Sequence, residues 1–328
     1  MKILSVGMMV CDTLLSTVPS NILELDSVSI QRPAVSCGGD ALNVAGGLAK
    51  LGIPVSIIGR IADDANGRYI LEQCAECGID ASGVIYDKEC ATASSYALID
   101  ESGERHFLSE KSIFEKLSAG DIPDDAIIGA DIIYFGSAMA MKSMDAGGIK
   151  NLFARAHQYG KITAMDAAIN REDAERNWMD YLSDAFLETD IFFPSREEAE
   201  KITGKKNPEE IAECFKAFPM SIFGMKLGDQ GCFVTDFKEN RYITPPKGMP
   251  VVDTTGAGDS FIAGLLCGIS HGWDCFTSAG FATSVAARNI GAVGGTAGIP
   301  NFEEALRFYQ ICKESDQINK QKGKDEKV

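Results

Sequence analysis

From about residue 130 onward, short apolar strands alternate with amphipathic helices. The sequence predicts strands over 131–135, 161–165, 189–193 and 223–227, and helices over 145–159, 174–187, 195–203 and 208–217. Parallel strands need crossover helices between them, and such helices cover both faces of the sheet. The sequence therefore predicts an α/β fold with a mainly parallel central sheet, whose ligands bind at the carboxyl ends of the strands.

The composition suits a globular protein with one large domain or two smaller ones. The chain has 328 residues, 45% of them hydrophobic. No apolar run reaches the ~18 residues that cross a membrane. The net charge of −16 argues against nucleic acid or an anionic membrane as a partner. Residues 1–10 are apolar, but the stretch is short and Asp12 follows it, so we interpret residues 2–7 as a buried strand and not as part of a signal peptide.

The ten cysteines are scattered, without the spacing of a small disulfide framework. They fit free thiols in a reducing cytoplasm, where we expect the protein to be located. Cys74 and Cys77 form a lone Cys-x-x-Cys late in a predicted helix, 64–77, and no second pair has the spacing of a zinc site. We interpret this pair as structural.

Residues 251–261, with the sequence VVDTTGAGDSF, predict a strand end, a tight turn and the start of a helix. The small residues of the turn let successive backbone N–H groups point toward one spot at the positive end of the helix, which suits a phosphate. Asp259 would repel that phosphate unless it acts as a general base on a neutral hydroxyl that attacks it. From these residues alone, an ordinary helix N-cap role for Asp259 stays open.

A second glycine turn lies about 200 residues earlier. Gly38 and Gly39 open a predicted helix that ends near Gly52. Asn43 falls in the first turn of this helix, either as an ordinary amide or as a ligand-binding one. Asp12 directly follows the first strand, where it is either a turn residue or a residue that faces a cleft.

Together, the two turns resemble the two signatures of the ribokinase-like (PfkB) carbohydrate kinases, in the expected order. The resemblance covers nearly the whole chain, from Asp12 to Gly294. It implies a three-layer sandwich with helices on both faces of the sheet and a small β lid. It also implies that the turn Gly256-Ala257-Gly258-Asp259 binds the transferring phosphate, and that Asp259 is the catalytic base.

The resemblance also implies a sugar site at the amino-terminal signature. Its members bind sugar hydroxyls with an Asp after the first strand and with the Gly-Gly-x-x-x-Asn turn, which correspond here to Asp12, Gly38, Gly39 and Asn43. Asp40 is our own addition to this site. It is either a second carboxylate near the sugar or merely the helix N-cap.

Two separate pieces of chain, 13–36 and 92–112, do not follow the βα alternation. The second turns at 101–104, which predicts a hairpin. We pair the two pieces as a β lid, and the resemblance implies that the lid closes over the sugar, excludes water and offers a dimer surface. Phe114 follows the hairpin and either packs on a substrate or closes the lid core. We expect the large domain over 1–12, 37–91 and 113–312, and a disordered tail over 313–328.

The resemblance implies sites for ATP and Mg²⁺ on the other side of the phosphate turn. Glu198 matches the Glu of an Asn-x-x-Glu motif that organises Mg²⁺ and its waters, although Ser195 replaces the Asn; a solvated helix face is the alternative for Glu198. Lys226 is expected near the phosphates, with a solvated strand end as its alternative. The following turn, Gly228 to Gly231, would line the nucleotide. Thr283 stands where family members often carry an adenine-contacting Asn.

A monovalent cation, K⁺, is also implied. In the family, the Asp of Asp-Thr-Thr and the loop after the last sheet-packed helix hold this activating ion. Asp253, Thr255 and the loop 288–294 correspond to these positions here.

We therefore expect an ATP-dependent kinase that phosphorylates a hydroxymethyl group of a sugar or sugar acid. A nucleoside kinase on the same fold is the main alternative, because its substrate also contains a ribose. A non-catalytic sugar or nucleotide sensor is a second alternative, and the intact Asp259 argues against it. The sequence does not distinguish among sugars, or between a monomer and a homodimer formed through the lid.

Overall fold

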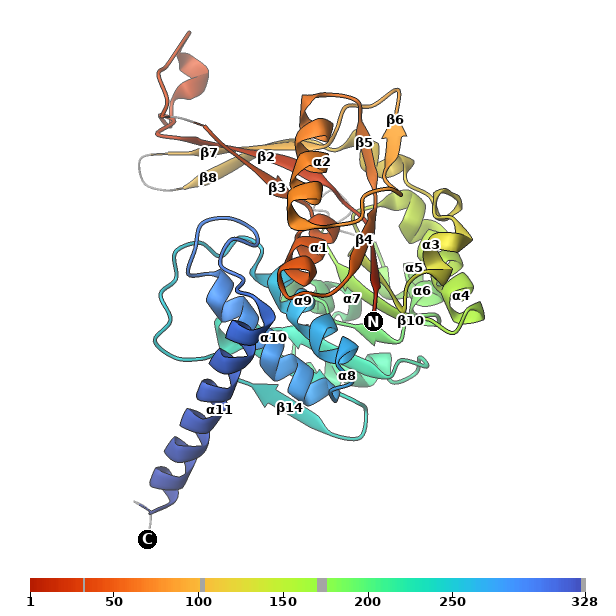
Figure 1. The fold of residues 1–328 in the computed structure, drawn as a ribbon, viewed down its shortest axis with the longest axis vertical. Helices are drawn as coiled ribbons and strands as arrows, with labels where there is room; N and C mark the ends of the chain where they lie inside the picture. Colours follow the sequence, from red (N-terminus) through yellow and green to blue (C-terminus); the bar gives the residue numbers. More distant parts are fainter. Residues whose placement is uncertain (32, 101–103, 170–175, 326–328) are drawn as a thin grey trace.

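The computed structural model describes residues 1–31, 33–100, 104–169 and 176–325 (Figure 1). The strands of its central sheet are β1 (Ile3–Val6), β4 (Val55–Ile58), β9 (Ile132–Ala138), β10 (Ile162–Ala167), β11 (Ile191–Phe192), β12 (Ile222–Lys226), β13 (Cys232–Thr235) and β14 (Asn240–Ile243). Their order is β14-β13-β12-β11-β10-β9-β1-β4. The strands from β4 to β12 pair in parallel, and β13 and β14 add an antiparallel edge.

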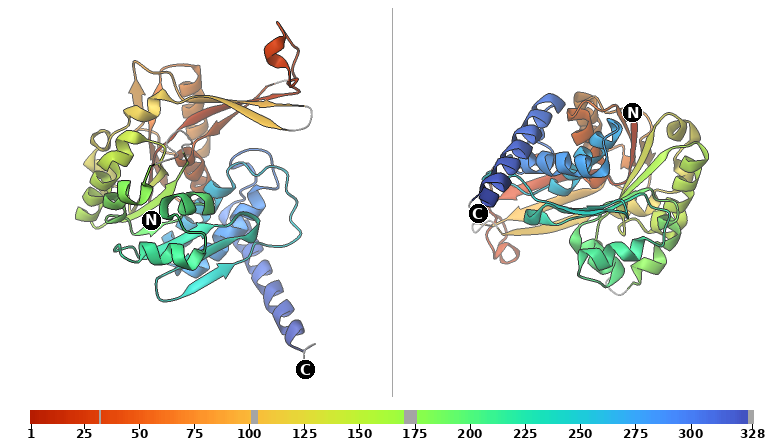
Figure 2. Two further views of the ribbon diagram at one scale, coloured as in Figure 1. Left: turned by 180° about the vertical axis from the view of Figure 1, so that it is seen from behind. Right: turned by 90° about the horizontal axis from the view of Figure 1, so that it is seen from below.

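Helices cover both faces of this sheet (Figure 2). One face carries α1 (Asp40–Lys50), α2 (Ala65–Cys77), α9 (Ala257–Ser270), α10 (Cys275–Asn289) and α11 (Phe302–Asp325). The other carries α3 (Asp124–Ile128), α4 (Ile149–Gln158), α5 (Trp178–Tyr181), α6 (Ser183–Phe186), α7 (Arg196–Thr203) and α8 (Pro208–Phe215). Side chains of β9 alternate between the two cores, with Ile132 in the first and Ile133 in the second. The predicted three-layer sandwich is confirmed. Across the described ranges, we find no helix with the length and apolarity needed to cross a membrane.

A separate four-stranded sheet forms the lid and projects from one end of the large domain (Figure 1). Its strands are β2 (Val10–Ser16), β3 (Ala34–Gly38), β7 (Ser94–Ile99) and β8 (Arg105–Glu110), in the order β3-β2-β7-β8. The strands come from the two chain pieces that we expected to pair. The first lid strand already includes Asp12, earlier than the expected boundary, and most of the predicted hairpin turn lies outside the described residues, at 101–103.

Several element boundaries differ from the sequence-based expectation. The single helix expected over 174–187 is two short helices, α5 and α6, because the backbone at Leu182 departs from helical geometry; residues 170–175 lie outside the described part. Strand β14 was not expected, because its residues are mostly exposed and form no apolar run. Helix α11 continues to Asp325, through most of the segment for which we expected disorder, since Glu, Lys and Gln are good helix formers. Residues 326–328 lie outside the described part.

Candidate active site

Helix α9 begins at the carboxy-terminal glycine turn. Gly256 is its N-cap, with φ of +69°, and a Cβ atom there would lie 2.1 Å from the carbonyl oxygen of Gly295, so only glycine fits. The N–H of Ala257 donates to the carbonyl of Thr254 (3.2 Å), so this amide is not available to a ligand, contrary to expectation. The amides of Gly258 and Asp259 have no backbone acceptor within the described ranges. These two N–H groups, at the positive end of a helix, form a candidate anion site.

Asp259 lies in the first turn of α9 and is not its N-cap, so the helix-cap interpretation is wrong. The Asn43 Nδ2 donates a hydrogen bond of 2.7 Å to Asp259 Oδ2. Burial raises the pKa of Asp259 above its ordinary value, while the Asn43 hydrogen bond lowers it in part. The two signatures, 216 residues apart, therefore meet at one carboxylate with increased proton affinity, which is the property of a general base.

Asp40 stands beside this pair. The N-cap of α1 is Gly39, so Asp40 is not the cap. Its Oδ1 atom accepts hydrogen bonds from Ser137 Oγ (2.6 Å) and from the Ala41 N–H (2.5 Å). Its buried Oδ2 atom and the hydroxyl of Tyr134, a residue only 1% exposed, have no hydrogen-bond partner in the part of the chain that the structure describes. Burial raises the pKa of Asp40 to about 7, and the charge of Asp259 contributes to the increase. Asp40 thus offers an unpaired acceptor near Asp259.

Lys226 and Glu198 approach the same site from strand β12 and helix α7. Lys226 Nζ forms an ion pair with Asp166, at the end of β10, and its side chain is only 14% exposed, so it is not a solvated strand-end lysine. Burial lowers the pKa of Lys226, but the charges of Asp166 and Glu198 outweigh this and raise it overall. A Cβ atom on Gly258 would lie 3.6 Å from Lys226 Nζ, so this cation is adjacent to the anion site.

Glu198 and Ser195 form a capping box at the start of α7. The Ser195 N–H donates to Glu198 Oε2 (2.6 Å), and the Glu198 N–H donates to Ser195 Oγ (3.3 Å). The serine that replaces the expected Asn therefore has its oxygen occupied by the helix. Glu198 still contributes negative charge to Lys226 and Asp166, so it lies at the site and not on a remote solvated face.

Asp12 is located where the lid meets the large domain. It pairs with Ser36 across β2 and β3, and a Cβ atom on Gly38 would lie 2.0 Å from Asp12 Oδ2, so a side chain at position 38 would displace the Asp12 carboxylate. Burial raises the pKa of Asp12 to about 6. Gly39 follows and leads directly into α1, which carries Asn43. Phe114 is buried in the large-domain core between the central sheet and helices α3–α8, and not in a core of the lid as the second of its two alternatives had it.

The loop after α10 closes around Asp253, which is buried. Asp253 Oδ1 accepts from the N–H (3.0 Å) and Oγ1 (2.7 Å) of Thr255, and Oδ2 accepts from the Gly294 N–H (3.0 Å). The Asn289 Nδ2 donates to the Gly295 carbonyl (2.9 Å), which holds the loop against the N-terminus of α9. Among the residues that the structure describes, no group of three His, Cys, Asp or Glu side chains is placed to hold a metal ion.

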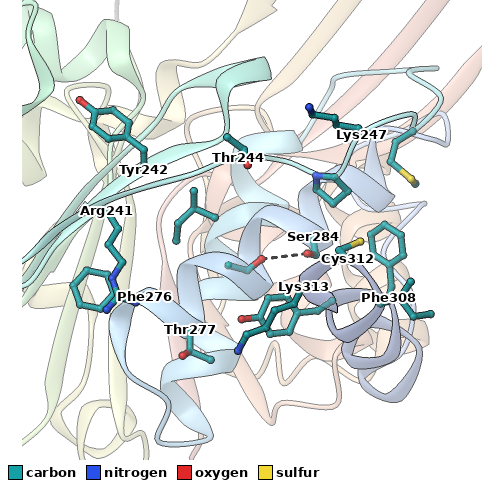
Figure 3. A pocket seen from close by; sticks show the side chains of 16 residues that line it. Arg241, Tyr242, Thr244, Lys247, Phe276, Thr277, Ser284, Phe308, Cys312 and Lys313 are labelled. Atoms are coloured by element: carbon teal, nitrogen blue, oxygen red, sulfur yellow. Dashed lines mark hydrogen bonds between the residues drawn. The ribbon is translucent and has the colours of Figure 1, made fainter. Parts of the chain in front are cut away.

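A cavity of about 480 Å³ lies between the edge strand β14, the following segment, α10 and α11 (Figure 3). The small residues Gly280 and Ser284 of α10 line it, together with aromatic and basic side chains such as Phe276, Phe308 and Arg241. The turn that ends at Gly231 packs against its wall, since a Cβ atom on Gly231 would lie 2.0 Å from the Ile243 carbonyl oxygen. Thr283 does not line this cavity; its hydroxyl is buried and donates to the Ala279 carbonyl (2.8 Å).

Sequence reasoning named most of the clustered residues but missed three of them. Ser137 and Tyr134 escaped notice because they belong to an apolar strand with no polar motif. Asp166 directly follows the predicted strand 161–165, but no local pattern in the sequence indicates its pairing with Lys226. On α10, Gly280 and Ser284 are four residues apart on one helix face, a spacing that offered a signal for the cavity lining.

Known proteins resemble this chain in sequence and in fold. The chain is 28% identical over 255 residues to a protein described as an uncharacterized sugar kinase from Archaeoglobus fulgidus, covering 77% of this chain and 98% of that protein. It is 25% identical over 307 residues to a 5-dehydro-2-deoxygluconokinase from Geobacillus thermodenitrificans, covering 89% and 91%. A ribokinase from Arabidopsis thaliana, solved with ribose and ATP, superposes with a TM-score of 0.78 at 21% identity, covering 94% and 98%.

The model of the pfkB family carbohydrate kinases matches residues 2–302. This match spans nearly the whole chain and contains both glycine turns and every side chain of the cluster described above. The protein therefore belongs to the PfkB family of carbohydrate kinases.

Proposed function

We propose that this carbohydrate kinase transfers the γ-phosphate of ATP to a hydroxymethyl group of a sugar or sugar acid. The observation that supports this best is Asp259, a buried carboxylate held by Asn43 in the first turn of α9. The free amides of Gly258 and Asp259 lie in the same turn. A base and an anion site within one helical turn suit the attack of a hydroxyl on a phosphoryl group.

In the proposed reaction, Asp259 takes the proton of the sugar hydroxyl as its oxygen bonds to the γ-phosphorus. The bond from that phosphorus to the β–γ bridging oxygen breaks, and ADP leaves. The N–H groups of Gly258 and Asp259 stabilise the phosphoryl oxygens, each by roughly 10²–10³ in rate, and the base contributes roughly 10²–10⁴. Lys226 lies beside Gly258 and adds positive charge where the phosphates would lie.

We propose that the sugar lies between the lid and the start of α1. Asp12 and Asp40 are hydrogen-bond acceptors with raised pKa values, and Asp40 Oδ2 is unpaired. The backbone of Gly38 and Gly39 lies between these two residues, because Gly38 contacts the Asp12 carboxylate and Gly39 directly precedes Asp40. Sugar hydroxyls are donors, so this set suits a polyhydroxylated substrate.

For the nucleotide, we propose that the Gly228–Gly231 turn contacts the phosphates and that the cavity on α10 receives the adenosine. The cavity volume of about 480 Å³ lies within the range of small-molecule sites. Gly280 and Ser284 leave room for a flat ring there, whereas Thr283 points away. This replaces the adenine contact that we expected at Thr283.

The residues also fit the two metal ions that the family uses. Mg²⁺ binds few protein ligands directly and keeps several waters, so Glu198 would hold it through a water, because Glu198 Oε2 is occupied by the Ser195 N–H. When bound, Mg²⁺ would neutralise charge on the ATP phosphates. Asp253 and the carbonyl groups near Thr255 and Gly294 are oxygen ligands of the kind that suits K⁺, and we propose that K⁺ supports the turn before α9.

We further propose a homodimer through the lid. Phe107 and Leu108 on β8 are each 61% exposed, and Val35 and Tyr96 on neighbouring strands are also exposed. Paired residues in the lid place Val35, Tyr96 and Leu108 on one face. Exposed apolar side chains on one face of a sheet favour association.

The test is ATP consumption by the purified protein with Mg²⁺ and K⁺, against neutral sugars, sugar acids, inositol and nucleosides. We expect turnover on one hydroxymethyl sugar or sugar acid. Asp259→Asn should lower kcat by roughly 10²–10⁴ and leave ATP binding measurable. Asp63→Asn is the matched control, because Asp63 is 81% exposed and forms a surface ion pair with Arg68.

Three outcomes would contradict parts of the proposal. Turnover on nucleosides alone would make the nucleoside kinase correct. Ligand binding in a thermal-shift assay without turnover on any compound would favour the sensor. Loss of ATP binding together with loss of the fold in Asp259→Asn would mean that Asp259 is structural.

A further inference from the structure

Four cysteines from three elements lie near one another at the base of the lid. Cys11 and Cys37 are direct partners across β2 and β3, so their side chains lie on the same face of the lid sheet. Cys74 and Cys77 lie one turn apart on α2. Helix α2 packs at this base, where the Tyr69 hydroxyl donates to the Val35 carbonyl of β3 (3.1 Å). The Cys-x-x-Cys that was a lone pair in the sequence thus has other thiols beside it.

A cavity of about 290 Å³ gives three of these thiols a common space. Cys37, Cys74 and Cys77 line it, and Asn43 and Gly295 also contribute to its wall. Cys77 is exposed, Cys37 is half-buried and Cys74 is buried. A small oxidant can therefore reach Cys77 from solvent, and the other thiols face the same cavity.

We propose that Cys37 forms a reversible disulfide with the Cys74–Cys77 pair of α2, and that this bond regulates the kinase. In a reducing compartment, such disulfides are transient and act as redox sensors. The described residues offer no group of three side chains for a metal ion, so the cluster does not suit zinc. This inference does not depend on the identity of the sugar.

The chemistry starts at Cys77 and needs a peroxide as oxidant. The Cys77 thiolate attacks one peroxide oxygen, the S–O bond forms, the O–O bond breaks, and the second oxygen leaves as water after protonation. Cys37 then attacks the sulfur of the Cys77 sulfenic acid, the S–S bond forms, and a second water leaves. Two thiols lose two electrons and hydrogen peroxide gains them. Burial raises the pKa of Cys37 to about 12 and that of Cys74 to about 11, so these two thiols are protonated at neutral pH and react with peroxide more slowly than a thiolate does. Exchange with Cys74 yields the same link between β3 and α2.

The position of the thiols connects this bond to the site. Cys37 directly precedes the Gly38–Gly39 turn, and Asn43, which holds Asp259, contributes to the wall of the same cavity. A disulfide to α2 would tie lid strand β3 to the large domain. Lid closure requires movement of the lid relative to the large domain. The disulfide should therefore lower kcat/KM for the sugar acceptor.

The experiment treats the purified full chain with hydrogen peroxide, alkylates the remaining thiols and maps peptides without reduction. We expect the peptide with Cys37 linked to the peptide with Cys74 and Cys77, a loss of at least about fivefold in kcat/KM for the acceptor, and recovery with dithiothreitol. Cys37→Ser should keep its activity when reduced and lose both the link and the response to peroxide. Cys214→Ser on α8 is the matched control and should respond like the wild type.

The peptide map does not depend on kinase activity, so it tests this proposal even if the proposed substrate is wrong. Cys37 left free, or linked to Cys11 within the lid, would overturn the tether. Equal inactivation of Cys37→Ser and wild type by peroxide would overturn its regulatory role, as would a Cys37–Cys77 link without any change in kinetics.

Discussion

Replacing Asp40 with Asn should change how the stability of the protein depends on pH. Asp40 Oδ1 accepts from Ser137 and Ala41, and the carbonyl oxygen of Asn can keep both hydrogen bonds. Asp40 Oδ2 has no partner within the described part of the chain, so the new NH₂ group interrupts no hydrogen bond there. The substitution therefore removes a titratable group and preserves most of the local geometry.

The magnitude follows from the pKa of Asp40, which burial raises from 3.8 to about 7 on folding. The folded protein binds this proton more tightly than the unfolded chain does. Asp40 therefore costs no stability below about pH 4, and its cost increases with pH until about pH 7. Each pH unit in this interval corresponds to about 1.36 kcal/mol, so the full cost is at most about 4 kcal/mol. The unpaired Asn NH₂ costs about 1–3 kcal/mol, but this penalty does not change with pH.

Urea unfolding of wild type and Asp40→Asn between pH 4.5 and 8 measures this difference, with tryptophan fluorescence as the signal. We expect the variant to gain stability relative to wild type as pH rises, by at most about 4 kcal/mol at pH 8. Asp63→Asn, at an exposed carboxylate, should show no such slope. A difference between wild type and Asp40→Asn that stays constant with pH would refute the reasoning. The same variant should weaken acceptor binding, because its NH₂ group replaces the unpaired acceptor oxygen Oδ2 that we propose for the sugar. Groups that bind substrate often cost stability in this way.

Two further substitutions test the phosphate site. Gly256→Ala should lower the free energy of unfolding by about 2–4 kcal/mol, because φ is +69° and the new Cβ would meet the Gly295 carbonyl. Gly272→Ala, at φ of +77° with nothing within 4 Å, is the control for the conformational cost alone, and equal losses in the two variants would contradict the clash. Lys226→Met should lower stability by about 3–5 kcal/mol, because it leaves Asp166 buried without its partner. Adding Asp166→Asn should restore most of that loss in urea unfolding; no recovery would mean that Lys226 acts through packing and not through the ion pair.

The thiol cluster and the Asp40 site illustrate where sequence reasoning stopped. Cys37 and Cys11 are far apart in the sequence, and only the pairing of β2 with β3 makes them neighbours. For Asp40 the sequence left open a helix cap or a second carboxylate near the sugar, and the backbone places Gly39 in the cap position and turns the Asp40 carboxylate toward Ser137. Neither contact follows from local propensity, because each depends on a distant strand: β2 for Cys37, and β9, which carries Ser137, for Asp40.

The sequence by itself determined the fold class and the two glycine turns. Apolar strands that alternate with amphipathic helices bury their apolar surfaces as a parallel sheet with helices on both faces. The turns at Gly38–Gly39 and Gly256–Asp259 are local, because small residues before a helix specify their own backbone shape. These features need no knowledge of distant residues.

Only the tertiary structure decided which side chains meet. The order of the strands brings Asp166 to Lys226, and the packing of α1 against α9 brings Asn43 to Asp259. The rotation of α10 about its axis turns Ser284 toward the cavity and Thr283 away from it. A sequence pattern defines the periodicity of one element, but the register and rotation between elements come from the packing of the whole core.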